Sequence, residues 1–462
     1  MNAEISARNS AIAYLNQGIA GVKQDPQLAY RLLCSAVTVD PSFAQGWYSL
    51  GNACADLKLL PAACAAFRRA LECPNGELSG DLTKDLKVKC LTNLGHFEYH
   101  SGEVDRSFVH TQMALLEDEK AAFAWTNLSM LYSIRQQHEA AIEAAMKGWK
   151  LDPTPLSETA LGFAYLFAGE FGLGLRHFEA RIAYKLQQLD SYPYPRWNGE
   201  VQKKNTILIL GEQGLGDSLS FARFILEVAY MCKKVILSVQ ATLVPLLKFM
   251  LPETVDVIPT TTNLPLADAW TPLGSIPAIL KMSSGVFTST KNLPIRDLPQ
   301  NDAAWKTPGK KLHIGIAWAG NKDNDIDHWR SVDIRTFLEL YQVPGVQLYS
   351  LQVGERVIDL HNAGCAGLIR DLSPYIHNAL DTASIMQELD LIVTIESFMG
   401  HLAGALGKQC FLLSSYMGGD YRVGRFGEHP IWYPNTTVFR QDERQDWKPV
   451  LNRIIKAVDR MI

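Results

Sequence analysis

The sequence predicts an α-solenoid of paired helices over residues 1–185, followed by α/β domains that are built on parallel sheets. Three observations lead to this fold class. Small and aromatic residues recur before residue 185 at a spacing of about 34 residues, the period of a two-helix repeat. The stretch 206–224, TILILGEQGLGDSLSFARF, reads as a buried strand that runs into a glycine turn and then a helix. After residue 205, aliphatic strands alternate with helices, which is typical of a doubly wound sheet.

Composition narrows the class of protein. The 462 residues suffice for two or three domains, and 47% hydrophobic with 20% charged residues is average for a soluble chain. A net charge of −4 gives no basic field, so nucleic acid is not an expected partner. The eight cysteines form no C-x-x-C pair, which argues against a zinc site or a disulfide framework. The start, MNAEISARNS, shows no secretion signal, and no apolar run reaches the roughly 20 residues of a transmembrane helix. We therefore expect a cytoplasmic location and no transmembrane segment.

The helical repeats can be aligned on their small and aromatic positions. Five segments resemble tetratricopeptide repeats, with an insertion near 74–87. The matching residues are Ala29, Ala36 and Pro41; Trp47, Leu50, Gly51, Ala63, Phe67, Ala70 and Pro74; Leu94, Gly95 and Ala114; Trp125, Leu128, Tyr132, Ala141 and Pro153; and Gly162, Tyr165, Gly174, Phe178 and Arg181. Small residues let paired helices approach closely, so Trp47, Trp125 and Tyr132 are expected in the core. Stacked repeats form a concave surface for peptides or proteins.

The second half divides into a connector and two strand-and-helix units. Prolines and aromatics without helical periodicity indicate an ordered connector over 186–204. The unit over 205–305 has expected strands at 206–210, 234–239, 255–258 and 267–273, and a helix at 241–250 whose Pro245 must lie in the first turn. The unit over 306–462 has expected strands at 313–319, 346–352, 389–395 and 409–414, and a closing helix at 447–461. Ser331 and Asp381 are expected helix N-caps.

The glycine turn after the first of these strands is the first candidate for chemistry. Gly211, Gly214 and Gly216 stand at the carboxyl end of a strand, where ligands collect in open α/β sheets. The turn lacks the Gly-Lys-Ser/Thr of a Walker loop, and its G-x-x-G-x-G order differs from the dinucleotide fingerprint. A tight strand–helix turn without a ligand is the alternative interpretation.

The turn at 396–401 is the second candidate. A helix that starts on small residues after a buried strand offers free N–H groups and a positive dipole end to a diphosphate. His401 in its first turn could donate to a phosphate oxygen, and Glu396 could accept from ribose hydroxyls. The alternative for His401 is a histidine buried in the core with its hydrogen bonds satisfied.

Together these stretches resemble one family. The matching motifs are GEQGLGDSLSFARF at 211–224, IAWAGN at 316–321, RS at 330–331, SLQ at 350–352, DTA at 381–383, HLAGALG at 401–407 and WYPNTTVFRQ at 432–441, with PRWNGE at 195–200 as the connector. They are similar to bacterial tetratricopeptide proteins that carry a heptosyltransferase-like (family 9) glycosyltransferase domain of GT-B fold. The resemblance covers nearly the whole chain. It implies two Rossmann-like halves, with 205–305 on the acceptor side and 306–462 binding the nucleotide-sugar.

The resemblance also implies roles for residues. Asp217 matches the candidate catalytic base, which would take a proton from an acceptor hydroxyl; the alternative is a plain helix cap. Glu396, Ser397 and His401, with Gly400 in the same turn, match the element that holds the donor's ribose and diphosphate. Gln352, Asp381 and Thr382 would line the nucleotide pocket. No metal or other cofactor is expected, because helix N-termini and basic side chains hold the leaving diphosphate in GT-B enzymes.

The chain departs from the family pattern at three places. The usual Asp-Thr is Glu396-Ser397, the next two residues are the bulky Phe398 and Met399, and Val353 follows SLQ where a lysine is common. A lost phosphate contact could be replaced by one of several residues, namely Asn321, Arg330, Arg356, Arg422 or Arg425.

The resemblance therefore implies a metal-independent glycosyltransferase that inverts the anomeric centre. Its repeats would recognise a protein acceptor, for example flagellin or another surface protein, and homo-oligomers are left open. One alternative is transfer to lipopolysaccharide or another glycan. The other is a non-catalytic repeat scaffold with a degenerate donor site.

Overall fold

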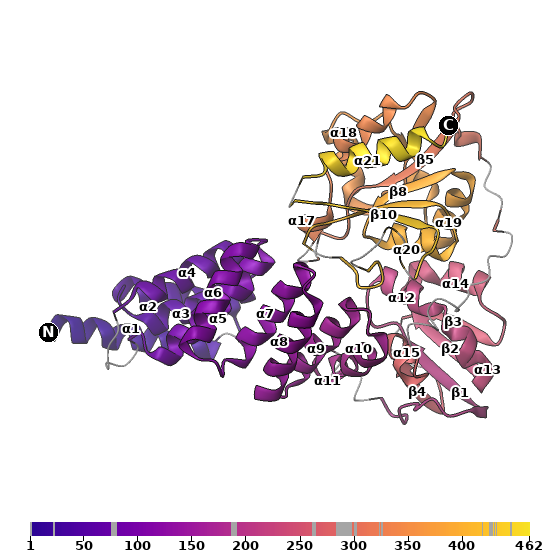
Figure 1. The fold of residues 1–462 in the computed structure, drawn as a ribbon. Helices are drawn as coiled ribbons and strands as arrows, with labels where there is room; N and C mark the ends of the chain where they lie inside the picture. Colours follow the sequence, from indigo (N-terminus) through magenta and orange to yellow (C-terminus); the bar gives the residue numbers. More distant parts are fainter. Residues whose placement is uncertain are drawn as a thin grey trace. The chain divides into compact units, whose positions relative to one another are not determined.

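The computed structural model divides the chain into two compact units, Met1–Ala164 and Tyr165–Ile462 (Figure 1). The described residues are 2–21, 24–74, 81–185, 192–260, 265–282, 298–299, 303–322, 324, 327–417, 419–424, 428, 430, 432–443 and 446–462. Within them, no helix combines the length and the apolar character that crossing a membrane requires.

The first unit is a solenoid of helix pairs. The pairs are α1 (Asn2–Gly21) with α2 (Pro26–Val39), α3 (Ala44–Asp56) with α4 (Leu60–Glu72), α5 (Lys84–His100) with α6 (Val104–Glu117), and α7 (Ala122–Ile134) with α8 (His138–Leu151). Helix α9 (Pro155–Phe167) follows and runs across the boundary between the units.

Close approach within the pairs depends on the small residues that define the repeat. A Cβ on Gly51 would lie 2.6 Å from the ring of Phe67, which is fully buried on the partner helix.

Trp47, Trp125 and Tyr132 are only half-buried, so the prediction that they belong to the core is wrong. The indole N–H groups of the two tryptophans donate to the backbone carbonyls of Pro41 at 2.9 Å and Glu119 at 2.8 Å. A polar ring atom that binds the backbone near the surface explains this position.

The last short helices pack in the second unit. Helices α10 (Phe171–Phe178) and α11 (Arg181–Lys185) lie beyond the unit boundary at 164, although the sequence predicts a helical domain to residue 185. Ile182 joins a hydrophobic cluster with Leu208 and Leu210 of the first sheet. Burial against that sheet accounts for the difference.

The first sheet has four parallel strands in the order β3-β2-β1-β4. They are β1 (Gln202–Leu210), β2 (Cys232–Val239), β3 (Val255–Pro259) and β4 (Ala269–Pro272), with helices α12 (Leu215–Ala222), α13 (Ile225–Met231), α14 (Val244–Met250) and α15 (Ile276–Ile279). All four strands were predicted, and Pro245 lies in the first turn of α14 as expected. The helix expected after the glycine turn is instead two helices, because the chain turns at Arg223 and Phe224.

The second sheet has six parallel strands in the order β10-β9-β8-β5-β6-β7. They are β5 (Leu312–Ala317), β6 (Val346–Ser350), β7 (Arg370–Asp371), β8 (Leu391–Ile395), β9 (Cys410–Ser414) and β10 (Thr436–Arg440). Helices α17 (Asp327–Arg330), α18 (Asp359–Asn362), α19 (Ala379–Glu388), α20 (Phe398–Ala405) and α21 (Lys448–Asp459) accompany them. Four of these strands and the closing helix were predicted, whereas β7 and β10 were not.

Both predicted N-caps of this part are wrong. Asp333 caps the 3-10 helix Ile334–Gln342, while the Ser331 hydroxyl donates to Asp327 at 2.8 Å. Asn378 caps α19, and Asp381 stands three residues later, where its carboxylate accepts from the Asn378 N–H at 3.2 Å. An acidic side chain is favourable at the N-cap and also three residues after it, so the sequence does not show which of the two positions Asp381 occupies.

Candidate functional site

A cavity of about 850 Å³ lies in the second unit, between the two sheets. Most of its lining follows the carboxyl ends of strands from both sheets: 214–217 after β1, Gln240 after β2, 319–322 after β5, 352–356 after β6, 396–401 after β8, and 415, 419, 420, 422 and 423 after β9. In open α/β sheets, this edge is where ligands bind. The volume is within the range of small-molecule sites.

The glycine turn forms one wall of the cavity. Gly214 and Gly216 line it at the start of α12, and Gly211 behind them donates its N–H to the Ser238 carbonyl at 2.8 Å. Gly211 has little room for a side chain, since a Cβ there would lie 3.2 Å from that same carbonyl oxygen. A Cβ on Gly216 would lie only 2.4 Å from His401 Cδ2. The turn therefore brings two helix starts, those of α12 and α20, against each other.

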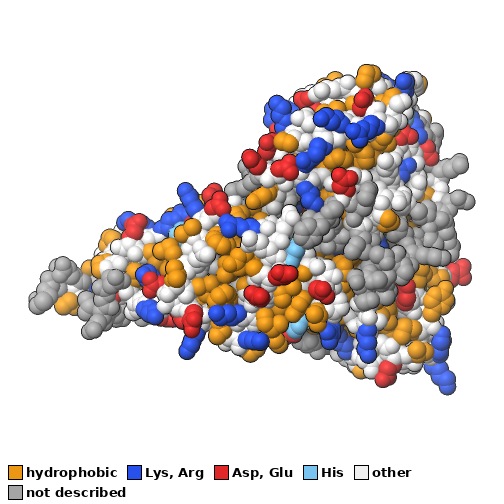
Figure 2. Space-filling model, in the orientation of Figure 1, with side chains coloured by type: hydrophobic (Ala, Val, Ile, Leu, Met, Phe, Trp, Pro, Cys, Tyr) orange, Lys and Arg blue, Asp and Glu red, His pale blue; other side chains and the backbone are white. Residues whose placement is uncertain are grey.

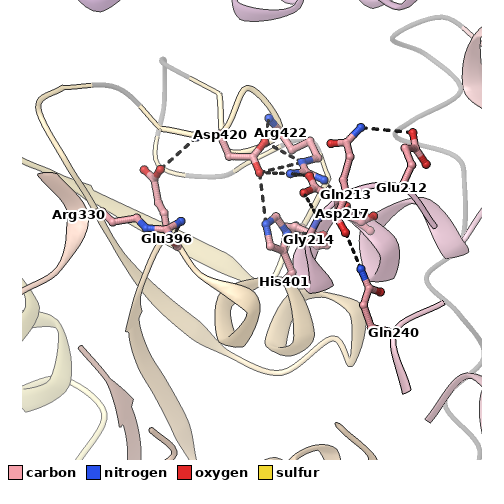
Figure 3. A network of polar contacts seen from close by, with 12 residues as sticks. Glu212, Gln213, Gly214, Asp217, Gln240, Arg330, Glu396, His401, Asp420 and Arg422 are labelled. Atoms are coloured by element: carbon pink, nitrogen blue, oxygen red, sulfur yellow. Dashed lines mark hydrogen bonds and ion pairs between the residues drawn. The ribbon is translucent and has the colours of Figure 1, made fainter. Parts of the chain in front are cut away.

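Asp217 lies at the cavity wall and is bound by two partners. Its Oδ2 accepts from the Gly214 N–H at 3.1 Å, which caps the start of α12. Its Oδ1 accepts from Arg422 Nη2 at 2.6 Å (Figure 3). The catalytic and the capping interpretations of Asp217 are therefore compatible with one position.

Arg422 joins the two halves of the second unit. Its Nε donates to both oxygens of Asp420, at 2.7 and 2.8 Å, and its Nη1 donates to Ser220 on α12. Although burial alone would lower it, the carboxylates of Asp420 and Asp217 hold the pKa of Arg422 well above its ordinary value. Burial works in the opposite direction on Asp420, yet Arg422 and His401 hold the pKa of that carboxyl far below its usual range. The Arg422 and Asp420 side chains are therefore charged.

His401 is placed in the first turn of α20, as predicted, but both of its ring nitrogens have partners. Nδ1 lies 2.9 Å from the Tyr433 hydroxyl, and Nε2 lies 3.3 Å from Asp420 Oδ2 (Figure 3). Donation to a phosphate, the predicted role, would require one of these partners to leave.

The residues before His401 follow a similar pattern. Glu396 is 8% exposed and its Oε2 accepts from the Asp420 N–H at 3.1 Å, so the carboxyl supports the loop around residue 420. Burial raises the pKa of Glu396. Ser397 is the N-cap of α20, and its side chain makes no capping hydrogen bond. Gly400 allows the helix to lie on β9, since a Cβ there would be 2.9 Å from Leu412.

Of the three residues that were predicted to line the nucleotide pocket, one lines the cavity and two do not. Gln352 lines the cavity, but its amide is held by the backbone of the β5 loop, with Oε1 accepting from Trp318 and Ala319 at 3.2 and 3.1 Å. Asp381 and Thr382 are absent from the described lining. They lie in the first turn of α19, where Thr382 Oγ1 donates to the Asn378 carbonyl at 3.2 Å.

The candidate phosphate contacts Asn321, Arg330 and Arg356 all line the cavity. Arg330 donates through Nη1 to the Glu396 carbonyl at 2.9 Å, and Arg356 donates to Asp359 at 2.9 Å. Val353 also lines the cavity and is 40% exposed. Arg425 is outside the described residues.

Several lining residues were not given a role from the sequence. Asp420, Tyr433 and Gln240 are among them, and Arg422 was considered only as a substitute phosphate contact. Gln240 holds the glycine turn through a hydrogen bond from Nε2 to the Gln213 carbonyl. An Asp-x-Arg pair between apolar residues at 420–422 is the one local signal that could have drawn attention to this loop. Within the described residues, no three His, Cys, Asp or Glu side chains are arranged as a metal site.

Comparisons with known proteins identify the repeats. A family model for the tetratricopeptide repeat matches residues 124–155, which contain most of α7 and all of α8. The first unit is a solenoid of helix pairs, and the family model identifies its α7–α8 pair as a tetratricopeptide repeat. This confirms the repeat predicted over 122–155.

Similarity to individual proteins is more distant. Protein FlbA of Caulobacter vibrioides is 24% identical over 359 residues, which cover 69% of this chain and 58% of that protein. The chain thus spans less than two thirds of that curated relative. Among solved structures, MamA of Desulfovibrio magneticus is 19% identical, with 40% of this chain and 98% of that chain covered and a TM-score of 0.31. A thermophilic tetratricopeptide-repeat protein of Thermus thermophilus is 15% identical, with coverage of 39% and 94% and a TM-score of 0.33.

Proposed function

We propose that Tyr165–Ile462 is a glycosyltransferase of GT-B type, which moves a sugar from a nucleotide-sugar to a hydroxyl group on a protein. The observation that carries the proposal is the cavity lined by the carboxyl ends of strands from two parallel sheets. A two-part ligand, a nucleotide joined to a sugar, suits a site with one sheet on each side.

The donor's diphosphate would lie at the start of α20. The first N–H groups of a helix have no partner within the helix, and the dipole favours an anion there. Ser397, Phe398 and Met399 line the cavity at this point, and Arg330 lies beside them through its bond to the Glu396 carbonyl. This arrangement stabilises the charge of a leaving nucleoside diphosphate without requiring a metal ion.

Asp217, in the first turn of the neighbouring helix α12, would act as the general base. The acceptor's oxygen forms a bond to the anomeric carbon while the bond from that carbon to the diphosphate breaks. The hydroxyl proton passes to the Asp217 carboxylate, and the diphosphate leaves with the electron pair. A single displacement of this kind inverts the anomeric centre.

The repeat unit would recognise the acceptor. Tetratricopeptide solenoids expose surfaces that hold peptides or proteins. Figure 2 shows hydrophobic side chains gathered between charged ones on the visible face of this unit. Helix α6, for example, exposes three hydrophobic side chains at helical spacing along one face, Val109, Met113 and Leu116.

A charge substitution at Ser397 tests the donor site. Ser397→Asp supplies a good N-cap to α20, so thermal stability should be kept, but its charge repels a diphosphate. Ser397→Asn has the same size and also caps, without the charge. Calorimetric titration with UDP, GDP, CDP and ADP should show one nucleotide binding the wild type, and Ser397→Asp weakening it at least about tenfold more than Ser397→Asn does. Equal binding by both variants, or no nucleotide bound by the wild type at millimolar concentration, would refute the proposal.

One observation favours a second candidate, a non-catalytic binding scaffold. Asp217, His401 and Asp420 are all paired with protein groups, so the residues expected to act on substrates also hold the two halves together. The same titration separates the candidates, because a scaffold without a donor site binds no nucleotide.

A further inference from the structure

We propose that Arg422 changes partners when the donor binds, leaving Asp217 for the diphosphate and so making that carboxylate available as the base. This inference rests on the proposed function and deepens it. It assigns Arg422 as a donor-binding residue and orders the two substrates, with the nucleotide-sugar before the acceptor.

Asp217 and Asp420 share one cation, the Arg422 guanidinium. Arg422 donates through Nη2 to Asp217 Oδ1 at 2.6 Å and to Asp420 Oδ2, and through Nε to both Asp420 oxygens at 2.7 and 2.8 Å. Its side chain is only 6% exposed. Asp420 is held a second time by His401. Asp217 has the more exposed side chain, at 28%, and its further bond is the single backbone contact to Gly214. The contact between Arg422 and Asp217 is therefore the weaker side of the arrangement.

The shared guanidinium lies at the proposed donor site. Arg422 lines the same cavity as the start of α20, and it reaches that helix through Asp420 and His401 (Figure 3). A phosphate can accept two parallel N–H groups from a guanidinium, and it carries more negative charge than a single carboxylate oxygen does. A diphosphate at the start of α20 would therefore compete with Asp217 for the Nη2 group.

The exchange of partners would change what Asp217 can do chemically. While Asp217 Oδ1 accepts from Arg422 and Oδ2 accepts from the Gly214 N–H, neither oxygen is available to an acceptor hydroxyl as a base. After the exchange, Oδ1 can accept a hydrogen bond from an acceptor hydroxyl and then its proton. The acceptor is activated only when a donor is present.

A double-mutant cycle on nucleotide affinity tests the exchange. Asp217→Asn removes the competing charge with little change in size, so the nucleoside diphosphate that binds the wild type should bind about fivefold to tenfold more tightly. Its monophosphate should bind unchanged. Arg422→Met should weaken the diphosphate, and adding Asp217→Asn to Arg422→Met should then have no effect. Arg422→Lys keeps the charge without the paired N–H groups and gives a second measurement should Arg422→Met fail to fold.

The outcomes are distinct. Unchanged diphosphate affinity in Asp217→Asn would overturn the inference, because Arg422 would then not be shared. A gain from Asp217→Asn that persists in the Arg422→Met background would overturn it too, since the charge of Asp217 would act directly on the ligand. If no nucleotide binds the wild type, the proposed function itself fails and the exchange falls with it.

Discussion

Arg181 of helix α11 donates through Nη2 to Oε1 of Glu212 at 2.7 Å, and both side chains are almost fully buried. Glu212 belongs to the glycine turn that begins after β1, and its Oε2 accepts from the Gly274 N–H at 3.4 Å. There is no space for a side chain at residue 274, because a Cβ would lie 2.7 Å from Glu212 Oε1. The ion pair thus anchors the glycine turn, which leads to Asp217, on helix α11.

Removing one member of this pair should destabilise the second unit strongly. Arg181→Met leaves the Glu212 carboxylate buried without its cation, which typically costs about 3–5 kcal/mol in the free energy of unfolding. Urea denaturation followed by tryptophan fluorescence measures it. The matched control is Arg69→Met, whose partner Glu72 is exposed in the first unit and whose pair should contribute less than about 1 kcal/mol. Similar losses in both variants would contradict the role given to Arg181.

Gly216 should not tolerate alanine, because His401 occupies the space of its side chain. The added methyl would lie 2.4 Å from His401 Cδ2, so the ring must move away from Tyr433 and Asp420. We expect a loss of about 1–3 kcal/mol in the free energy of unfolding.

Gly172→Ala is the control for this variant. Gly172 lies in α10 with no atom within 4 Å of an added Cβ. Alanine there should be neutral or stabilising by up to about 1 kcal/mol, because a helix favours it over glycine. Thermal denaturation compares the two, and equal stability would show that His401 is not confined by Gly216.

Local sequence signals were sufficient for the framework of the fold. Runs such as 206–210 and 234–239 have few conformations open to them other than a buried parallel strand, and the glycines that follow mark the turn. The solenoid was predictable for the same reason, since Gly51 and its equivalents must be small wherever two helices meet. The short strand β7 and the strand β10 carry too little apolar sequence to be separated from loops.

The contacts of the candidate site have no such local signal. Arg422 and Asp217 are 205 residues apart in the sequence, and nothing around either residue names the other. His401 was placed correctly at the start of a helix, but its partners Asp420 and Tyr433 come from loops whose path depends on the tertiary fold. Sequence therefore predicted which turns form the cavity wall and not which side chains pair across it.

Acid should weaken the repeat unit through His96. Burial and the neighbouring His100 lower the pKa of His96 from 6.5 to about 4, although Asn127 opposes this. The unfolded chain therefore takes up a proton that the folded chain does not, and stability falls as the pH drops from about 6.5 toward 4. The loss amounts to roughly 3 kcal/mol at most. Hydrogen exchange of α5, corrected for intrinsic rates, should show it in the wild type and much less in His96→Gln.

An exposed histidine provides the control for that experiment. His361 lies on the surface of the second unit, so His361→Gln should leave the pH dependence of α5 unchanged. An unaltered acid response in His96→Gln would assign it to other groups.

Glu396 should produce the opposite dependence on pH in the second unit. Burial raises the pKa of its carboxyl in the folded chain, so the folded state holds a proton that the unfolded state releases. Stability is then greatest below the unfolded pKa of about 4.3, and it declines as the pH rises toward the raised value.

Glu396→Gln keeps an oxygen that can accept from the Asp420 N–H and has no proton to lose. Relative to the wild type, this variant should therefore gain stability in urea denaturation as the pH rises above about 4.3. Glu339→Gln, at an exposed position, is the matched control and should show no such gain. If Glu396→Gln parallels the wild type across this range, the carboxyl is ionised in the folded protein, and its support of the 419–422 loop is that of a charged group.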